Sequence, residues 1–124
     1  MARVIKQSDL PVLDSTRDGR DRVDLITEEL FGLTSIKADK ITYHPGDTAA
    51  AHYHRDAKHF FFVLDGRGVL HVDDASHDLG PGDVALVVED EVHWFENPSD
   101  DTFTFIELWV PQPSETIWVK DDDV

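Results

Sequence analysis

From residue 35 onward, the chain alternates between short segments rich in β-branched and aromatic residues and short segments of turn-forming residues. Five segments have the composition of strands, at 35–43, 59–64, 69–72, 84–88 and 102–110. The segments between them contain Pro-Gly, Asp-Gly and Asn-Pro pairs, which are typical of tight turns. Many short strands with regular turns favour an antiparallel sandwich or barrel. The sequence therefore predicts an all-β fold.

One segment before this region is ambiguous. In 22–31, Val23, Ile26, Leu30 and Phe31 have helical spacing, although Val23-Asp24-Leu25 can also begin a strand. We predict a strand there. The whole chain has 124 residues and contains no repeat or linker, so it is expected to form a single domain.

Charge excludes some classes of partner. The chain has 11 Lys and Arg against 26 Asp and Glu, a formal net charge of −15. Binding to nucleic acid or to an anionic membrane needs a basic surface, so neither is expected. Residues 1–44 carry 7 basic and 8 acidic side chains, whereas residues 45–124 carry 4 and 18. Such an acidic surface occurs on ordinary acidic proteins and on salt-adapted ones, and we favour a salt-adapted, halophilic host.

Cysteine is absent, which excludes disulfide bonds and thiolate ligands or nucleophiles. The longest strictly apolar runs are 60–64 and 84–88, and the N-terminal residues include no hydrophobic segment. Neither a signal peptide nor a membrane span is expected, and we predict a cytoplasmic location.

The histidines suggest a metal site. His52 and His54 are two residues apart in a strand-like stretch, so their side chains leave the same face about 6.6–7 Å apart. A loop-like segment at 55–58 can re-aim the chain so that His59 joins them, and His93 can reach them from a distant strand. Imidazoles without sulfur suit Mn, Fe, Ni, Cu or Zn rather than Ca or Mg. The alternative is that these histidines, like most in β-rich proteins, are surface or half-buried residues.

The residues around these histidines resemble two motifs of the cupin superfamily. The first motif is matched in spacing by Gly46, His52, His54 and Gly66, with His59 at the position where the family usually has Glu. Four neutral imidazoles would leave the full charge of a divalent ion for other ligands, which favours an anionic, bidentate substrate.

The second motif follows at the expected separation. It is matched by Gly82, His93 and Asn97, with Val88 and Asp90 at the positions of the usual proline and glycine. Two motifs in the correct order make the resemblance specific. The glycines are expected in turns, and Asn97 is expected to fix the turn after the strand that carries His93.

The resemblance implies a small double-stranded β-helix, or jelly-roll barrel, that forms one cupin domain over 1–124. Its core would span 36–110, with N-terminal strands in 1–35 and a C-terminal strand and acidic tail in 111–124. It also implies that His52, His54, His59 and His93 hold one divalent first-row metal at the mouth of the barrel. Manganese or iron is favoured, with copper, nickel and zinc as alternatives. The remaining histidines, His44, His71 and His77, are expected at the surface.

The strand at 102–110 leaves one question open. Phe105 and Glu107 belong to one alternating set of side chains and Ile106 and Leu108 to the other. If the first set faces inward, Glu107 is a buried carboxylate near the metal and a candidate general base. The alternative is an exposed glutamate at the rim.

Aromatic residues are candidates for lining the pocket around the metal. By alternation, Phe61 shares the face of His59 and Phe95 that of His93. Together with Phe105 they are candidate pocket residues, and packing in the core is the alternative.

The tryptophans suggest apolar surface beyond what one small barrel buries, at Trp94, Trp109 and Trp118. Small cupins commonly dimerise, so a homodimer is expected, with 116–120 as a candidate exchanged strand.

Three functions are compatible with this sequence. The first is a metal-dependent dioxygenase or oxidase of a small anionic enolate, diketone or phenolic substrate. The second is a redox-neutral isomerase or ring-opening lyase acting on sugar acids, in which a side chain such as Glu107 moves the proton. The third is a non-catalytic module that binds metal or a metabolite.

Overall fold

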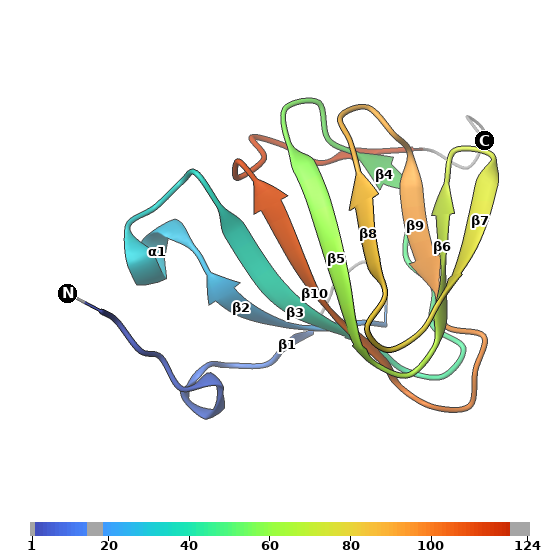
Figure 1. The fold of residues 1–124 in the computed structure, drawn as a ribbon, viewed down its shortest axis with the longest axis horizontal. Helices are drawn as coiled ribbons and strands as arrows, with labels where there is room; N and C mark the ends of the chain where they lie inside the picture. The colour runs from blue at the N-terminus through green and yellow to red at the C-terminus, as the bar shows by residue number, and fades with distance from the viewer. Residues whose placement is uncertain (1, 15–18, 120–124) are drawn as a thin grey trace.

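Two antiparallel sheets face each other in the computed structural model, which describes residues 2–14 and 19–119 (Figure 1). The first sheet has six strands in the order β1-β2-β3-β10-β5-β8, and the second has five in the order β11-β4-β9-β6-β7. This is the expected all-β jelly-roll. The acidic tail at 121–123 lies outside the described residues.

The bounds of the elements follow the chain. The first sheet contains β1 (Leu13–Asp14), β2 (Asp21–Ile26), β3 (Lys37–Tyr43), β5 (Lys58–Asp65), β8 (Val84–Val87) and β10 (Phe103–Val110). The second contains β4 (His52–Tyr53), β6 (Gly68–Val72), β7 (Ala75–Leu79), β9 (His93–Glu96) and β11 (Ile117–Trp118). Two short helices, η1 (Gln7–Asp9) and α1 (Glu28–Phe31), lie near the N-terminus.

All five predicted strands are present, as β3, β5, β6, β8 and β10. The strand predicted over 22–31 is correct up to Ile26 and wrong beyond it, because α1 follows. Thr27 caps this helix by accepting a hydrogen bond from the backbone N–H of Leu30 at 3.1 Å, and Gly32 ends it with a φ of 72°. The candidate exchanged strand corresponds to β11, which pairs with β4 of the same chain.

Strand β10 decides which side chains face the interior. It lies between β3 and β5, and Phe103, Phe105, Glu107 and Trp109 are at most 7% exposed. The set that contains Glu107 therefore points inward, so the interpretation of Glu107 as an exposed rim residue is wrong.

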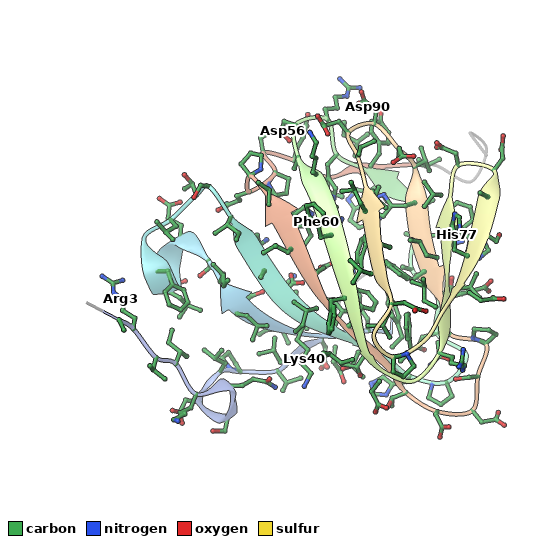
Figure 2. All side chains as sticks on the ribbon, in the orientation of Figure 1. Arg3, Lys40, Asp56, Phe60, His77 and Asp90 are labelled. Carbon is green, nitrogen blue, oxygen red and sulfur yellow. The ribbon has the colours of Figure 1, made fainter. Side chains whose placement is uncertain are left out.

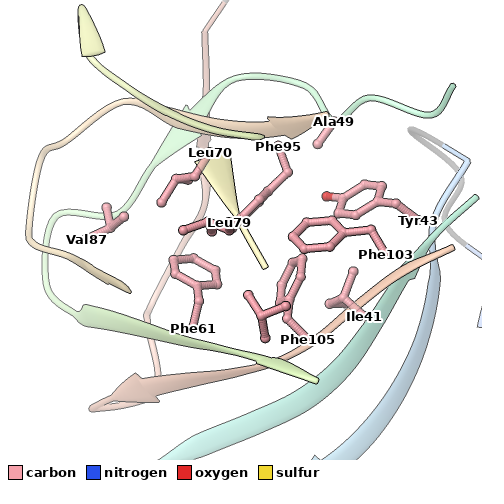
Figure 3. Close-up of a cluster of buried hydrophobic side chains, with 11 residues drawn as sticks. Ile41, Tyr43, Ala49, Phe61, Leu70, Leu79, Val87, Phe95, Phe103 and Phe105 are labelled. Carbon is pink, nitrogen blue, oxygen red and sulfur yellow. The ribbon is translucent and has the colours of Figure 1, made fainter. Parts of the chain in front are cut away.

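The hydrophobic core fills the space between the sheets (Figure 3). Aromatic rings from both layers meet there, with the ring centroids of Phe61 and Phe95 4.8 Å apart and those of Phe95 and Phe105 4.5 Å apart. The core residues are Ile41, Tyr43, Ala49, Phe61, Val63, Leu70, Leu79, Val87, Phe95, Phe103 and Phe105. Since this core is closely packed, it provides a rigid base for the histidines beside it.

Turns between strands confirm two expectations from the motifs. Gly46, Gly66 and Gly82 all have positive φ. Asn97 donates hydrogen bonds to the carbonyls of Tyr43 (3.2 Å) and Asp101 (2.7 Å) and so fixes the turn after β9.

Asp90, which replaces the usual glycine of the second motif, adopts the left-handed conformation with a φ of 68°. Its N–H donates to the carbonyl of His54 at 2.8 Å. The loop before β9 therefore has a residue in the left-handed conformation, although that residue is aspartate and not glycine.

No helix in the described part of the chain has the length and apolarity needed to cross a membrane.

Candidate metal centre

Three of the predicted histidines converge at one end of the second sheet. His52 begins β4 and His93 begins β9, and the two residues are directly paired between these strands. His54 follows β4. One ligand nitrogen from each of the three lies within 4.8 Å of the others. The structure thus brings together His52, His54 and His93, from segments up to 41 residues apart, as the sequence predicted.

Backbone carbonyls fix the orientation of all three rings. The Nδ1 atoms donate hydrogen bonds of 3.0 Å, from His52 to Ala50, from His54 to Glu115 and from His93 to Glu91. With Nδ1 protonated, each Nε2 carries a lone pair. The Nε2 atoms of His54 and His93 are buried and have no hydrogen-bond partner.

Burial also favours the neutral form of His52 and His93. It lowers the pKa of His52 to about 4 and that of His93 well below its usual value. Imidazoles that are held through Nδ1 by carbonyl groups, and whose other ring nitrogen is left for a ligand bond, have the form required of metal ligands. The residues therefore fit a divalent first-row metal.

His59 lies beside this cluster, and its ring contacts Glu107 and Trp109. Its ring centroid is 5.6 Å from that of His54 and 5.5 Å from that of His93. Its Nε2 is 3.0 Å from Oε2 of Glu107, and its ring stacks on Trp109 at 4.3 Å. Burial lowers the pKa of His59, so the neutral ring donates Nε2–H to Glu107. The assignment of His59 as a fourth ligand stays a prediction.

Glu107 is part of a buried carboxyl pair with Asp39, its partner across β10 and β3. Asp39 is 1% exposed, and burial together with the Glu107 charge raises its pKa. Burial acts to raise the pKa of Glu107 as well, but hydrogen bonds from His59 and Asp39 outweigh it and lower that pKa. Glu107 is thus a buried carboxylate that accepts a hydrogen bond from His59 and shares one with the Asp39 carboxyl group.

A cavity of about 180 Å³ joins the histidines to the carboxyl pair. Its lining comprises Arg20, Arg22, Lys37, Asp39, His52, His54, Glu107, Trp109, Pro113, Thr116 and Trp118. Asp39 and the three cations were not predicted from the sequence. On β3, Asp39 points to the same face as Ile41 and Tyr43, which are buried. A charged residue among buried apolar side chains is unusual, so this pattern could have indicated Asp39 as a functional residue.

The predicted pocket phenylalanines all lie in the core beneath the site (Figure 3). The ring centroid of Phe61 is 4.2 Å from that of His59. Phe95 and Phe105 pack on each other, and none of the three is part of the cavity lining. The reason is that the lining comes largely from the ends of β2 and β3 and from the C-terminal segment, which cover one side of the histidines.

The remaining histidines lie outside the cluster. His44 is hydrogen-bonded to Asp21 at 2.8 Å and His71 to Glu96 at 2.7 Å. His77 is exposed on β7 (Figure 2). Of the tryptophans, Trp109 and Trp118 line the cavity, whereas Trp94 stacks on His71.

The chain is similar to several known proteins. Protein SchB from Streptomyces halstedii is 31% identical over 99 residues, which cover 80% of this chain and 70% of SchB. The polyketide cyclase RemF from Streptomyces resistomycificus has a TM-score of 0.83 at 18% identity, covering 99% of this chain and 90% of RemF. A cupin-superfamily sugar phosphate isomerase from Silicibacter pomeroyi has a TM-score of 0.79 at 22% identity, covering 97% of this chain and 94% of that one.

The likeness to solved structures supports the fold. The family is shown by the match of residues 40–111 to the cupin-domain family model, a region that contains all four motif histidines. This chain belongs to the cupin family.

Proposed function

We propose that this protein is a metal-dependent enzyme that moves a proton on a small, anionic, enolisable carbonyl compound without net oxidation. The observation that carries the proposal is the position of Glu107, a buried carboxylate that lines the same cavity as His52 and His54. A general base and a candidate metal site that share one small cavity are the two components that enolisation needs.

The metal would be held by His52, His54 and His93, with manganese or iron favoured, and when bound it would polarise the carbonyl group of the substrate. Glu107 would take the proton from the carbon next to that carbonyl and return it to the product. His59 and Asp39 hold the Glu107 carboxylate in place by donating hydrogen bonds to it. The Nδ1 atom of His59 is buried and has no hydrogen-bond partner among the described residues, so His59 could join a four-histidine centre while its Nε2 stays bonded to Glu107.

The names of two similar structures are compatible with this chemistry. Polyketides and sugar phosphates both contain carbonyl groups, and cyclisation and isomerisation both involve no net oxidation. These likenesses support the fold, and the proposal for this chain depends on Glu107.

The test is hydrogen–deuterium exchange at the carbon next to the carbonyl, followed by proton NMR in D₂O. Zinc-loaded protein, freed of excess metal, is incubated with the anionic compounds pyruvate, 2-oxobutyrate, acetoacetate and oxaloacetate. We expect exchange of at least one compound, and a loss of about 10²-fold or more in Glu107→Gln with unchanged metal content. Equal rates in both proteins, or no exchange of any compound, would contradict the proposal.

A second candidate function is the oxidative one, a dioxygenase or oxidase of an enolate, diketone or phenolic compound. It is favoured by one observation, that three histidines converge while His59 is bonded to Glu107. Three ligands leave half of an octahedral shell for substrate and oxidant. Oxygen uptake in the presence of iron or manganese, abolished by His93→Ala, would support this function over the first.

A further inference from the structure

A second cluster of reactive side chains lies on the outer face of the five-stranded sheet. The neighbouring strands β9, β6 and β7 (Figure 1) carry its members, Glu96, His71 and Ser76. Oγ of Ser76 is 2.9 Å from Nδ1 of His71, and Nε2 of His71 is 2.7 Å from Oε1 of Glu96. Two hydrogen bonds therefore join a hydroxyl group, an imidazole and a carboxylate in series.

This cluster is separate from the candidate metal centre. Successive side chains of a strand point to opposite faces of the sheet. Leu70 and Phe95, which precede His71 and Glu96 on β6 and β9, are buried in the core. His71 and Glu96 therefore point outward. His93 belongs to the buried set of β9 together with Phe95, so the two sites lie on opposite faces of the sheet.

The carboxylate determines the tautomer of His71. A carboxylate only accepts hydrogen bonds, so Nε2 of the neutral ring carries the proton and donates it to Glu96. Nδ1 then has a lone pair and accepts a hydrogen bond from the hydroxyl group of Ser76. An imidazole that is oriented by a carboxylate and accepts the hydroxyl proton is the arrangement that activates a serine as a nucleophile.

The base is held in place and the nucleophile is open to solvent. His71 pairs with Trp94 across β6 and β9, and the two rings stack with centroids 4.6 Å apart and 13° between their planes. The side chain of His71 is 19% exposed, whereas Ser76 is exposed on β7. A substrate at the surface can therefore reach Oγ of Ser76 without displacing the imidazole.

The edge of the sheet supplies a donor for negative charge that develops on a substrate. In the described part of the chain, β7 is the edge strand of this sheet. The backbone N–H of Asp73 donates to the carbonyl of Val92, just before β9, so the backbone groups of His71 also point to β9. Ser76, which lies opposite His71, therefore points its backbone N–H to the open edge. There it can donate to the oxyanion that forms when its own Oγ attacks a carbonyl group.

A groove of about 280 Å³ lies next to this cluster. On β6, Val69 is two residues from His71, and on β7, Asp78 is two residues from Ser76, so each pair shares a face at a separation of about 7 Å. Apolar side chains make up much of the lining, which suits an apolar acyl group. The groove is lined by Arg67, Gly68, Val69, Asp78, Leu79, Pro98 and Ser99.

We propose that Ser76, His71 and Glu96 form an acyl-transfer site that hydrolyses esters of small apolar acids, an activity separate from the function proposed above. Oγ of Ser76 bonds to the acyl carbon, the bond from that carbon to the alcohol oxygen breaks, and the serine proton passes through Nδ1 of His71 to the alcohol. Water then attacks the acyl carbon, the acid leaves, and a proton from the water returns to Oγ. The reaction needs no metal.

Phenylmethanesulfonyl fluoride tests the nucleophile, since a bond from sulfur to Oγ forms while the S–F bond breaks and the proton leaves with fluoride. Peptide mass spectrometry of the full chain should locate one sulfonyl group on Ser76 and none in Ser76→Ala. His71→Gln should slow this labelling about 10²-fold or more, and Glu96→Gln at least about ten-fold. The matched control is His77→Gln, on the exposed part of β7 but without a hydrogen bond to Ser76, and it should react as wild type does. An unlabelled Ser76, or equal rates in His71→Gln and His77→Gln, would overturn the inference.

Hydrolysis of p-nitrophenyl esters tests the groove. Wild-type protein should hydrolyse the butyrate with a kcat/KM about ten-fold above that of the acetate, because two more methylene groups are buried. Val69→Ser should remove this preference and leave hydrolysis of the acetate unchanged. Hydrolysis that persists in Ser76→Ala would belong to another site, such as the metal centre, and would refute the role of Ser76. Equal values for the two esters in wild type would refute the groove as the acyl site.

Discussion

Each clustered histidine is oriented by a backbone carbonyl, and this contact determines which ring nitrogen is available. His52, His54 and His93 donate Nδ1–H at 3.0 Å, which leaves the lone pair at Nε2, and one ligand nitrogen from each ring lies within 4.8 Å of the others. His59 has the opposite tautomer, because its Nε2 donates to Glu107. At the residue scale, the four histidines therefore divide into three candidate ligands and one that orients the candidate base.

Burial of these histidines predicts how the stability of the metal-free protein depends on pH. The pKa of His52 is about 4 in the folded protein and about 6.5 when unfolded. Above pH 6.5 the ring is neutral in both states. Between pH 6.5 and 4 the unfolded chain binds the proton and the folded one does not, so the free energy of unfolding falls as pH falls, by up to about 3 kcal/mol for this residue.

Urea unfolding of metal-free protein at pH 7.5 and pH 5 measures this loss. His52→Gln should make the loss smaller, whereas His77→Gln, at an exposed position on β7 (Figure 2), should leave it unchanged. An identical loss in wild type and His52→Gln would show that His52 is not the group responsible.

Among the structural elements, the turn between β5 and β6 has the strictest requirement for glycine. Gly66 has a φ of 76°, and a Cβ at this position would clash with the backbone carbonyl of Thr102. Gly82 has a φ of 89°, but its Cβ would meet nothing within 4 Å. Gly66→Ala and Gly82→Ala therefore share the backbone strain and differ in the clash.

We expect Gly66→Ala to lower the free energy of unfolding by about 2 kcal/mol more than Gly82→Ala does. Thermal or urea unfolding of the two variants checks this difference. Equal destabilisation would mean that the β5–β6 turn relaxes and that the close approach of Thr102 does not constrain position 66.

The predictable elements were those with strong local signals. Strands such as β3 and β5 are rich in β-branched and aromatic residues, whereas β7 was missed because Ser76, His77 and Asp78 are polar and exposed. Helix α1 was missed because its four residues, Glu28–Phe31, give too short a pattern.

The histidines of the site were predictable, and the rest of the cavity was not. The orientation of Glu107 stayed open because both faces of β10 are apolar, with Ile106 and Leu108 on the outside. Arg20, Arg22 and Lys37 belong to no motif. They reach the cavity only because β2 and β3 extend the first sheet past β10, an arrangement that depends on tertiary pairing.

At the scale of the whole molecule, the negative charge is unevenly distributed along the chain. Because the net charge is −15, an anionic substrate would meet long-range repulsion from the protein. Arg20 and Lys37 line the cavity beside His52 and His54, and both come from residues 1–44, the part of the chain with nearly balanced charge. The salt-adapted host stays a prediction.

The outer face of the six-stranded sheet is apolar. Phe62, Leu64, Val84 and Leu86, on the neighbouring strands β5 and β8 (Figure 1), are 46%, 43%, 65% and 47% exposed. Contiguous apolar surface of this kind is uncommon on monomers. We propose that a second copy of the chain covers it, because two such faces complement each other and avoid the acidic surface elsewhere.

Analytical ultracentrifugation tests this dimer. Wild-type protein should sediment as a dimer, and Val84→Asp should sediment as a monomer. Val4→Asp makes the same change at a valine that is 79% exposed outside the sheets, and it should remain a dimer. A monomeric wild type, or a dimeric Val84→Asp, would refute this interface.

The chemistry proposed for this protein requires a metal held by His52, His54 and His93. Elemental analysis of protein purified without added metal tests it directly. We predict close to one divalent first-row ion per chain in wild type, nearly complete loss in His93→Ala and in the double variant His52→Ala with His54→Ala, and a smaller loss in His59→Ala. A double variant that keeps its metal would contradict the central claim.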